Sequence, residues 1–560
     1  MLLVDQQFFY FSIHITREFV MIWISFSSCR DLGIIVQVDN NKILETLKTT
    51  TDKYDIIIIG AGHNGLIAAA YLAKAGKRVL ILEANDEIGG ATTSVRAFPD
   101  FDARLSRYSY LVSLLPDQIV SDLGLNFKTL SRKVASYTPF RHQGIEQGLY
   151  VSRIWDETTS ASFNALPDGN IEARAWQKFY GEIEKFAQRM APSLLKPLPT
   201  RSELKKQIGQ DAIWNSLIEN PIGEVITNTF KSDIVRGVVL TDALIGTYVS
   251  AFSMQANKCF LYHLIGNGNG EWKVPAGGMG SLVQELERVA KSSGVSIAVN
   301  SRAVKVQSDG KEVSVTLENG SNIDGKYLLS NAAPQVLAKL RGMNPPESLE
   351  GSQLKINMLL KQLPRLKSGM NPHDAFAGTF HVNESFSQLD SAYNQAQAGK
   401  ISSPLPLEMY CHTLTDPSIL SAELQHKGYH TLTLFGLHTP AALFDRNHDV
   451  QRKTAMDAAI RSLNEYLTDP IESVLARSST GELAIEVKTP LDIEAAIGLP
   501  RGNIFHRDLD FPFREDNDAP GWGVETDDPR IFICGAGAKR GGGVSGIPGH
   551  NAAMAVLAKD

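Results

Sequence analysis

Three glycines and one glutamate in a short stretch of the sequence could together hold a nucleotide. The stretch Tyr54–Ala84 reads YDIIIIGAGHNGLIAAAYLAKAGKRVLILEA, and Gly60, Gly62 and Gly65 have the spacing G-x-G-x-x-G. Glycines at this spacing allow a tight turn and a close backbone approach to a pyrophosphate, which the amides and dipole of a helix start then bind. Glu83 follows Gly60 by 23 residues, close to the offset of about 20 for an acid that accepts from a ribose hydroxyl. The stretch predicts a dinucleotide site.

Three elements around these glycines would place them. Ile56–Ile59 is a continuous apolar run, which is typical of a strand buried on both faces of a parallel sheet. Leu66–Ala75 is rich in alanine and leucine and is followed by Gly76, which favours a helix with a glycine at its C-terminal end. Arg78–Leu82 is apolar and β-prone again, with Glu83 directly after it. The pattern predicts a strand–turn–helix–strand unit; an ordinary glycine-rich turn is the alternative.

A second pair of glycines indicates which dinucleotide binds. Gly89 comes six residues after Glu83 and is followed by Gly90 and Ala91. The stretch EANDEIGGA resembles the extended fingerprint of FAD-dependent oxidoreductases of the glutathione-reductase-like superfamily. Nicotinamide dehydrogenases usually lack this second pair, which would let another backbone segment approach the phosphates of a flavin nucleotide. We therefore expect FAD as the cofactor; a surface turn is the alternative for the pair taken alone.

The C-terminal end of the chain repeats this arrangement. Ile531–Cys534 predicts a short buried strand, and a loop rich in glycine follows it. A helix that carries residues 551–558 is expected to begin near Gly549. Backbone amides at the start of a helix stabilise the negative charge that develops on a flavin ring when it is reduced. We expect this loop to hold the electron-rich edge of the flavin, with packing alone as the alternative.

Composition and charge narrow the class of protein. The chain has 560 residues, enough for two or more domains and a large core. Its net charge is -6, with charges of both signs spread along the chain, which argues against a nucleic-acid-binding face. No apolar run reaches the roughly 18 residues that a transmembrane helix needs. The four cysteines are too far apart in sequence for a C-x-x-C redox pair or a cysteine zinc site; they are Cys29, Cys259, Cys411 and Cys534. We expect buried, reduced thiols and no metal.

Residues 1–50 differ from the rest of the chain. They are aromatic-rich without clean periodicity, and they contain acidic residues, which makes them a poor transit peptide. We interpret them as an extension outside the fold. The alternative is a weak membrane-surface or targeting segment, which leaves peripheral membrane contact open. The expected compartment is the cytoplasm, or the mitochondrial matrix if the source is eukaryotic, without secretion.

The rest of the chain divides into two interleaved domains. Short alternating strands between 295 and 327, with Gly310 and Gly320 at their turns, return the chain to the nucleotide-binding domain. The cluster Gly277–Gly280 lacks a preceding apolar strand, so we predict a helix start there and no dedicated NAD(P)H site. The expected boundaries are 1–50 for the extension; 51–145, 270–345 and 495–560 for the FAD-binding domain; and 146–269 and 346–494 for the substrate domain.

Three motifs carry a resemblance to a known family. GAGHNGL at 60–66, TPLDIEAAIGLPRGNIFH at 489–506 and CGAGAKRGGGVSGIPGHNAA at 534–553 are similar to the phytoene desaturase-like FAD oxidoreductases. Within that group the resemblance is closest to the branch of pyridine nucleotide-disulfide oxidoreductase domain-containing protein 2, and it covers about 54–555. It implies an α/β fold: a Rossmann-like FAD-binding domain of the glutathione-reductase-like superfamily, assembled from separated segments, and an α+β substrate domain.

The resemblance also implies site residues. The FAD contacts that it implies in the first part of the chain are Gly60, Ala61, Gly62, His63, Asn64, Gly65, Glu83, Gly89, Gly90 and Ala91. Val304 is expected to contact the adenine through its backbone. The C-terminal residues expected near the flavin ring are Gly537, Gly543, Val544 and Ser545. No catalytic acid–base pair is assigned, because the scattered candidates are more often structural or surface residues; they are His63, Arg107, His142 and His263.

Together these observations predict an FAD-dependent oxidoreductase. A C–H bond of a small apolar or partly apolar substrate, of the isoprenoid or lipid kind, would lose hydride to flavin N5, and the protein would supply orientation, dryness and the field of helix amides. Electrons would leave to oxygen, a quinone or NAD(P)+. One alternative is a flavin amine oxidase, against which the absence of aromatic residues from 535–549 counts. Another is an FAD-binding regulatory or interaction protein without robust turnover.

Overall fold

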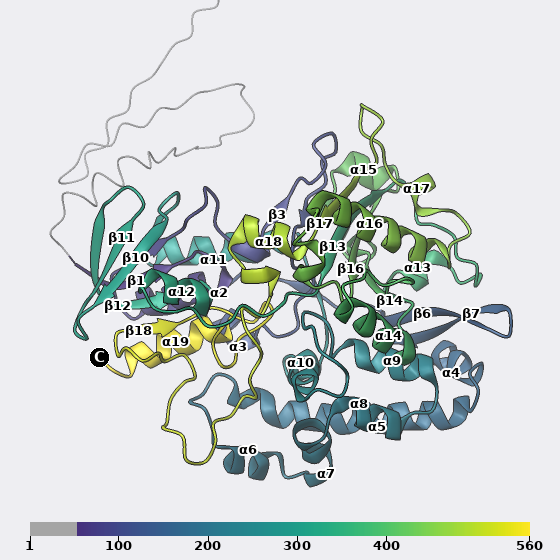
Figure 1. Cartoon of the computed structure of the whole chain (residues 1–560), viewed down its shortest axis with the longest axis horizontal. Helices are drawn as coiled ribbons and strands as arrows, with labels where there is room; N and C mark the ends of the chain where they lie inside the picture. Colours follow the sequence, from purple (N-terminus) through teal and green to yellow (C-terminus); the bar gives the residue numbers. More distant parts are fainter. Residues whose placement is uncertain (1–52) are drawn as a thin grey trace, which may run out of the picture. The chain divides into compact units, whose positions relative to one another are not determined.

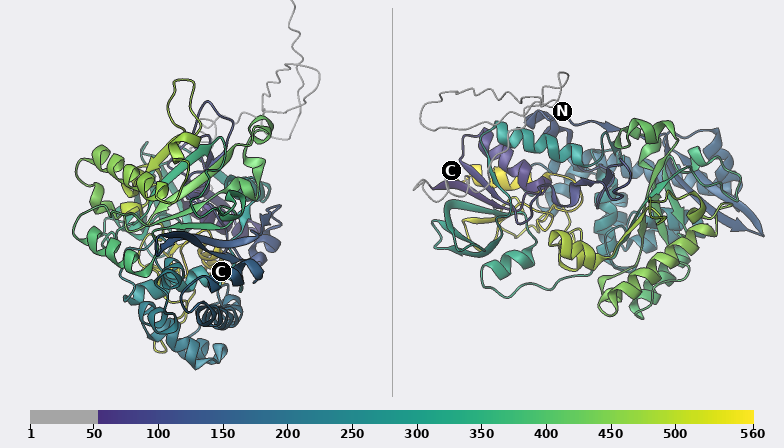
Figure 2. Two further views of the ribbon diagram at one scale, coloured as in Figure 1. Left: turned by 90° about the vertical axis from the view of Figure 1, so that its right-hand side faces the viewer. Right: turned by 90° about the horizontal axis from the view of Figure 1, so that it is seen from above.

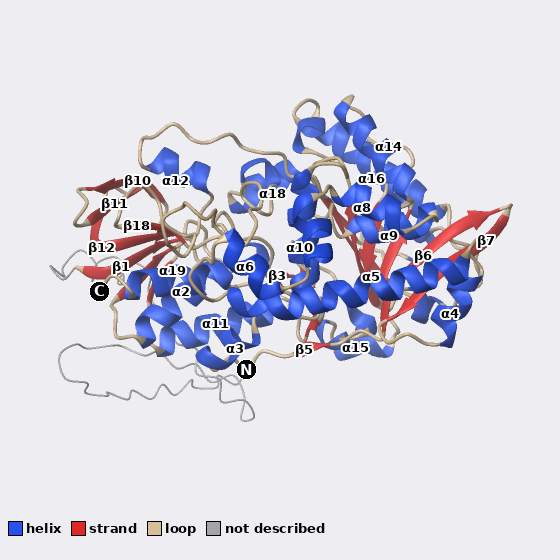
Figure 3. Cartoon of the chain, turned by 90° about the horizontal axis from the view of Figure 1, so that it is seen from below, coloured by secondary structure: helices blue, strands red, loops and turns tan. Residues whose placement is uncertain are grey.

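The computed structural model describes residues 53–560, and the predicted extension 1–50 lies outside the described residues. Within the described part, two seven-stranded sheets lie side by side (Figure 1). The view from above in Figure 2 shows the same separation, and helices pack around both sheets (Figure 3). Along residues 53–560, none of the helices is both long and apolar enough to cross a membrane.

The first sheet contains the strands predicted around the glycine motif. Its strands are β1 (Tyr54–Ile59), β2 (Val79–Leu82), β9 (Ser296–Ala298), β10 (Ala303–Ser308), β11 (Val313–Leu317), β12 (Asn322–Ser330) and β18 (Ile531–Ile533). They run in the order β10-β11-β12-β1-β2-β9, and β18 pairs with the last residues of β12. The neighbouring strands β9, β2, β1, β12 and β18 are parallel to one another. β10, β11 and β12 form an antiparallel meander. The Rossmann-like sheet assembled from separated segments is therefore confirmed.

The first strand is buried on both faces, as its run of isoleucines predicts. Ile56 and Ile58 join the core beneath α2 (His63–Lys74), α11 (Gly280–Ser292) and α19 (Ile547–Leu557). Ile57 and Ile59 join the opposite core, which the β10–β11 hairpin covers together with α12 (Pro334–Leu340). Because both faces are covered, the sheet is rigid where β1 ends and the glycine loop begins.

The second sheet belongs to the other half of the described chain. Its order is β17 (Ile485–Lys488), β13 (Leu354–Leu360), β16 (His430–Gly436), β15 (Leu407–Tyr410), β14 (Thr379–Val382), β6 (Val134–His142) and β7 (Ile145–Ser152). The pairs are antiparallel except for β6 with β14. The expected boundary at 145 falls inside the β6–β7 hairpin, because a tight turn at Gln143 and Gly144, both with positive φ, pairs these neighbouring strands. The segment 51–145 thus contributes one strand to the second sheet.

A group of helices between 157 and 265 lies below the second sheet in Figure 1. These helices are α4 (Glu157–Asn164), α5 (Gly169–Met190), α6 (Arg201–Ile208), α7 (Asp211–Trp214), α8 (Ile222–Thr229), α9 (Asp233–Thr241) and α10 (Met254–Ile265). The remaining helices are α3 (Asp117–Leu123), α13 (Pro372–Ala375), α14 (Phe386–Gln397), α15 (Ala422–His426), α16 (His448–Asn464), α17 (Ile471–Val474) and α18 (Pro490–Ile497). Two short strand pairs complete the fold: β3 (Ser94–Val95) with β4 (Leu105–Ser106), and β5 (Thr129–Leu130) with β8 (Val274–Pro275).

Candidate functional site

A cavity of about 470 Å³ has walls from both halves of the described chain. Its volume lies within the range of about 300–1,000 Å³ that is common for ligand sites. β1, β2 and β12 are neighbouring parallel strands, and the residues that follow their carboxyl ends, Gly60, Glu83 and Asn331, all line the cavity. Ligands of open parallel sheets bind outside the carboxyl ends of the strands. The sheet therefore places the glycine motif at a ligand cavity.

The loop after β1 leaves little room for side chains at its three glycine positions. Gly60 has a φ of +96°, which is a left-handed conformation that favours glycine. A Cβ atom on Gly65 would lie 2.4 Å from the Gly60 carbonyl oxygen, and a Cβ atom on Gly62 would lie 2.8 Å from the side-chain nitrogen Nδ2 of Asn331. Helix α2 begins at His63 without a side-chain N-cap. Its first N–H groups are therefore free to bind an anion in the cavity.

Glu83 stands at the end of β2 and is 9% exposed. Each of its carboxylate oxygens accepts one backbone N–H, from Ala61 at 2.8 Å and from Asn85 at 2.9 Å. These two bonds fix the carboxylate between the glycine loop and the next turn. Because each oxygen can accept a second hydrogen bond, the group is positioned to receive hydroxyl donors from the cavity.

The second glycine pair packs directly against the first loop. Gly89 donates its N–H to the Ala61 carbonyl at 2.9 Å, and a Cβ atom on Gly89 would lie 2.9 Å from the Val283 side chain. A Cβ atom on Gly90 would lie 3.6 Å from the Gly62 Cα. The approach of one backbone segment to another that the sequence predicted is thus present between the two glycine motifs.

The C-terminal loop reaches the same cavity. Gly543 and Val544 line it, and helix α19 begins three residues further on at Ile547. A Cβ atom on Gly549 would lie 2.2 Å from the Asn64 carbonyl oxygen. The backbones of α19 and α2 are therefore in direct contact at this point. Ser545 accepts the Ile547 N–H at 3.3 Å and is fully buried. The two ends of the folded chain therefore meet at the cavity.

The structure brings most of the predicted residues to one place. Those that line the cavity are Gly60, Gly62, His63, Asn64, Glu83, Gly90, Ala91, Gly543 and Val544. Those that support the lining from behind are Ala61, Gly65, Gly89, Gly537 and Ser545. Val304 is not among the lining residues and its side chain is 46% exposed, whereas its neighbours Ser301, Arg302 and Ala303 line the wall. Its expected contact with the adenine through the backbone stays a prediction. The roles of these residues as cofactor contacts stay predictions.

Sequence reasoning missed two contributors to this wall. Asn331 follows β12 and donates its amide to the Gly60 carbonyl at 3.2 Å, bracing the glycine loop. The segment 493–499, which includes most of α18, covers the cavity beside Glu83, where Asn85 donates to the Ala496 carbonyl at 3.4 Å. The rule of strand carboxyl ends could have indicated Asn331. The motif 489–506 was a signal for α18, although its position in the fold could not be read from the sequence.

The other end of the cavity, which we call the substrate end, is largely apolar. It is lined by large aromatic and aliphatic side chains, namely Tyr110, Leu111, Leu114, Ile245, Tyr262, Trp272, Phe435, Ile504 and Phe505. These residues come from loops, from α10 and from β16. Such a wall excludes water and favours an apolar ligand.

Lys355 is a buried amine at the substrate end. It lies on β13, is 1% exposed, and donates a hydrogen bond to the Tyr108 carbonyl at 3.0 Å. Its Nζ stands 4.7 Å from the centre of the Phe435 ring and 5.7 Å from that of Tyr110. Burial lowers the pKa of Lys355 to about 7, although the Glu486 carboxylate opposes this shift. The amine therefore exchanges its proton near neutral pH, which suits acid–base chemistry.

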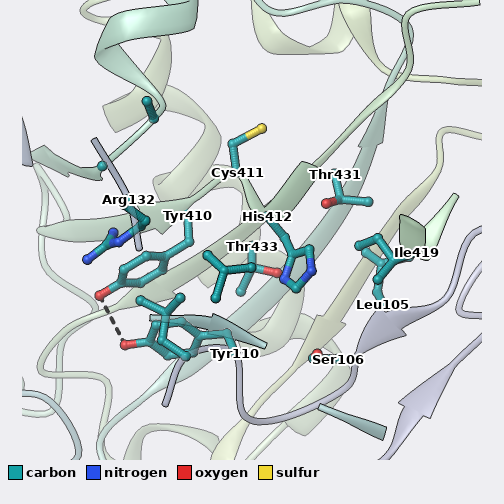
Figure 4. Close-up of a pocket in the computed structure, with 14 residues that line it drawn as sticks. Leu105, Ser106, Tyr110, Arg132, Tyr410, Cys411, His412, Ile419, Thr431 and Thr433 are labelled. Atoms are coloured by element: carbon teal, nitrogen blue, oxygen red, sulfur yellow. Dashed lines mark hydrogen bonds between the residues drawn. The ribbon is translucent and has the colours of Figure 1, made fainter. Parts of the chain in front are cut away.

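Tyr110 separates the substrate end from a small polar pocket (Figure 4). The hydroxyls of Tyr110 and Tyr410 are 3.0 Å apart, and Figure 4 shows them pointing toward each other. Arg132 beside them donates to the Trp272 carbonyl at 3.2 Å, and burial lowers the pKa of its guanidinium to about 10. The pocket of about 20 Å³ has room for one water molecule. Since its hydroxyl is bound here, Tyr110 adds ring surface to the cavity.

The four acid–base candidates separate into two groups. His63 and His263 line the cavity, whereas Arg107 and His142 do not. Arg107 pairs with Glu486 at 3.6 Å, and His142 ends strand β6. Burial lowers the pKa of His263 to about 4, which keeps its imidazole neutral.

The thiols are kept protonated. Cys259, Cys411 and Cys534 are buried and free, and burial raises the pKa of each thiol. Cys259 lines the substrate end and lies 3.8 Å from His263 Nδ1. Neutral thiols are poor nucleophiles, so these groups pack rather than react. Cys29 lies outside the described residues.

The fold and the cavity define a two-sheet oxidoreductase of the Rossmann-like, FAD-binding class. The model of the family described as flavin containing amine oxidoreductase matches residues 65–355, more than half of the chain, and the chain belongs to this family. The predicted FAD cofactor and the prediction of an enzyme are thereby confirmed.

Relatives and one solved structure support the assignment. An uncharacterized protein of Mycobacterium tuberculosis is 44% identical over 530 residues, 90% of this chain and 97% of that protein. Mouse pyridine nucleotide-disulfide oxidoreductase domain-containing protein 2 is 31% identical and covers 90% of this chain and 93% of its own, which confirms the resemblance. Carrot prolycopene isomerase is 23% identical over 80% of this chain and 73% of its own. A putrescine oxidase variant shares the fold, with a TM-score of 0.56, 16% identity and coverage of 91% and 99%.

The residues present fit FAD. The cradle at Gly62 and Gly65 leaves space that side chains would fill, and Glu83 is a fixed acceptor next to it. The glycine loop and the start of α2 would hold the pyrophosphate, Glu83 the ribose, and the loop 543–545 the flavin. When bound, FAD supplies a two-electron acceptor.

Proposed function

We propose that this enzyme dehydrogenates an apolar or partly apolar substrate of the isoprenoid or lipid kind, whose C–H bond loses hydride to flavin N5. The observation that carries the proposal is the wall of the substrate end. Aromatic and aliphatic side chains such as Tyr262, Trp272 and Phe435 dominate it. Burial of apolar substrate surface contributes roughly 25 cal/mol per Å², which would hold such a molecule without charged contacts.

The charges around the cavity support a substrate without a cationic amine. Among the described residues that line it, the carboxylates are Glu83 and Glu494. Both lie at the nucleotide end, beside the glycine loop and on α18. The substrate end instead offers Lys355, which would repel an ammonium group when it is protonated.

The chain's own residues would then act by positioning and by accepting a proton. The aromatic wall excludes water and orients the C–H bond. Lys355, in its neutral form above about pH 7, would accept the proton that a dehydrogenation releases from the substrate. The electrons would then pass to oxygen, a quinone or NAD(P)+, which is part of the proposal.

A flavin amine oxidase is the second candidate, favoured by the family description and by the fold shared with putrescine oxidase. The lysine at the substrate end counts against it. The third reading, an FAD-binding regulatory protein, predicts no turnover at all. An isomerase of the kind that the carrot relative's name describes would need reduced FAD but consume no electrons.

One experiment separates these readings. The purified yellow protein is mixed without oxygen with a panel of isoprenoids, lipids and amines, and loss of the flavin's visible absorbance is followed. Bleaching by isoprenoids or lipids supports the proposal, and bleaching by amines alone overturns it in favour of an amine oxidase. Absence of bleaching across the panel, together with no apolar ligand in mass spectra of the purified protein, overturns it in favour of a binding protein.

A further inference from the structure

We propose that His63 and His506 form a proton-accepting pair coupled to the redox state of the bound flavin. The inference needs the flavin and does not depend on the proposed substrate. Three motifs far apart in sequence meet at these rings: His63 belongs to the glycine loop and His506 to 489–506. The backbone of Gly543 in the C-terminal loop acts on the pKa of the His63 ring, and Gly543 lines the same cavity. Both histidines line the cavity.

Neither ring is fully hydrogen-bonded. His63 Nε2 and His506 Nδ1 are buried and have no hydrogen-bond partner among residues 53–560. Buried polar atoms without partners are costly and rare in folded proteins. His506 also has a φ of +64°, a left-handed conformation that is uncommon for residues other than glycine, although histidine adopts it more often than most. Unmet hydrogen bonds concentrate at functional sites, and both of these rings line the cavity.

The surroundings of the pair contain no counter-charge. Burial lowers the pKa of His63 to about 4, with His506 adding to the shift, and burial alone lowers the pKa of His506 to about 4. Among the described residues, no carboxylate acts on either ring.

Two charged residues in the adjoining loops are bound elsewhere. Arg507 donates to the Gly537 carbonyl and pairs with Asp510, and Arg540 donates to the Ser193 and Lys196 carbonyls. Both rings are therefore neutral at pH 7 until negative charge appears in the cavity.

Reduction of a flavin brings such charge. A rise of a histidine pKa from about 4 to about 7 is roughly a thousandfold change in its protonation equilibrium. One unit charge about 4 Å away, in a medium of effective dielectric about 20, supplies a shift of this size. The balance is then two electrons and one proton on the flavin and one further proton, from solvent, on a ring nitrogen of the pair.

The test is the slope of the flavin midpoint potential against pH, measured between about pH 5 and 7, above the pKa of the rings with oxidised flavin and below their raised pKa with reduced flavin. For a two-electron couple, each proton taken up contributes about 30 mV per pH unit. The wild-type slope is expected near 59 mV, for two protons. His63→Asn keeps a donor for the Gly543 carbonyl, and His506→Asn tolerates the left-handed backbone. The slope of the double variant is expected to fall by half.

His438→Asn is the matched control. His438 also has a positive φ, an unpartnered Nδ1 and a pKa lowered to about 4 by burial, but it lies outside the cavity. It should keep the wild-type slope. Equal slopes in all variants overturn the proposal.

A second measurement uses the wild-type protein alone. Proton uptake during anaerobic reduction at an electrode, which delivers electrons without releasing protons, is followed at about pH 6 with an indicator dye in weak buffer. Two protons per flavin are expected, and one proton overturns the pair. Because this measurement needs no variant, a failure of the double variant to fold or to retain flavin leaves the proposal testable.

Discussion

At the nucleotide end of the cavity the wall is made of backbone, whereas at the substrate end it is made of large side chains. Gly60 and Gly65 shape the first end, because any Cβ there would meet strain or the loop itself. Tyr110, Trp272 and Phe435 shape the second. A wall of backbone depends on residue types at fixed spacing. A wall of side chains depends on which strands and loops the fold brings together, so it should tolerate shape changes better than changes of charge.

The largest expected effect comes from adding one methyl group at the nucleotide end. The new Cβ of Gly65→Ala would lie 2.4 Å from the Gly60 carbonyl oxygen, and relief of that clash must move the loop or α2. We expect FAD affinity to fall at least about 100-fold, measured by flavin content and by titration of the apoprotein. Gly181→Ala, also inside a helix but with no atom within 4 Å, should bind FAD normally. Normal affinity in both variants would contradict the backbone account of this end.

The second effect tests charge at the substrate end. Lys355→Met keeps the length of the side chain and removes the amine. We expect flavin reduction by substrate to slow about 100-fold, and its rise with pH through about 7 to disappear. Lys488→Met is the control, because Lys488 pairs with Lys355 in register on β17 but does not line the cavity. Equal rates of flavin reduction in the two variants would show that Lys355 takes no part in the reaction.

The same lysine also predicts a pH dependence of stability. The folded-state pKa of about 7 lies below the ordinary value of 10.5, so between these values the unfolded chain binds more protons than the folded one. The free energy of unfolding should therefore rise with pH from about 7 to about 10.5. In Lys355→Met, denaturant unfolding across this range should lose that rise. An unchanged slope would show that Lys355 is not buried as an amine.

A smaller effect is expected for the acid at the nucleotide end. Glu83→Gln keeps the shape but replaces one of the two oxygens that accept from Ala61 and Asn85 with an amide donor. Hydrogen bonds to charged groups contribute roughly 1.5–3 kcal/mol, so FAD affinity should fall about 10- to 100-fold. Glu494→Gln, at the other carboxylate among the described lining residues, should change it less than about threefold. Similar losses in both would indicate a general effect of negative charge on FAD binding.

The sequence predicts the two ends of the cavity unequally, for physical reasons. The spacing of Gly60, Gly62 and Gly65 and the position of Glu83 have local causes, so one short stretch was enough to predict the dinucleotide site. Lys355 gives no such signal, because a lysine in a strand becomes notable only when the fold buries it at a cavity. The contact of Val304 with the adenine stays a prediction for a related reason: it was expected through the backbone, and the outward side chain does not decide it. The domain boundary at 145 fell inside a hairpin because its strand partners, β7 and β14, could not be read from the segment itself.

The smallest effect asks whether α18 belongs to the nucleotide end. Gly498 ends α18 with a φ of +70° and lines the cavity, and Gly124 ends α3 with a φ of +66° outside it. In both cases a Cβ would meet nothing within 4 Å, so an alanine at either position costs only the left-handed conformation, about 1–2 kcal/mol. Gly498→Ala and Gly124→Ala should each lower the Tm by about 1–2 °C. Only Gly498→Ala should also weaken FAD binding, by a few-fold, because the end of α18 shifts over Glu83, the predicted ribose acceptor. If FAD affinity falls equally in both variants, α18 is a neighbour of the site and not part of its wall.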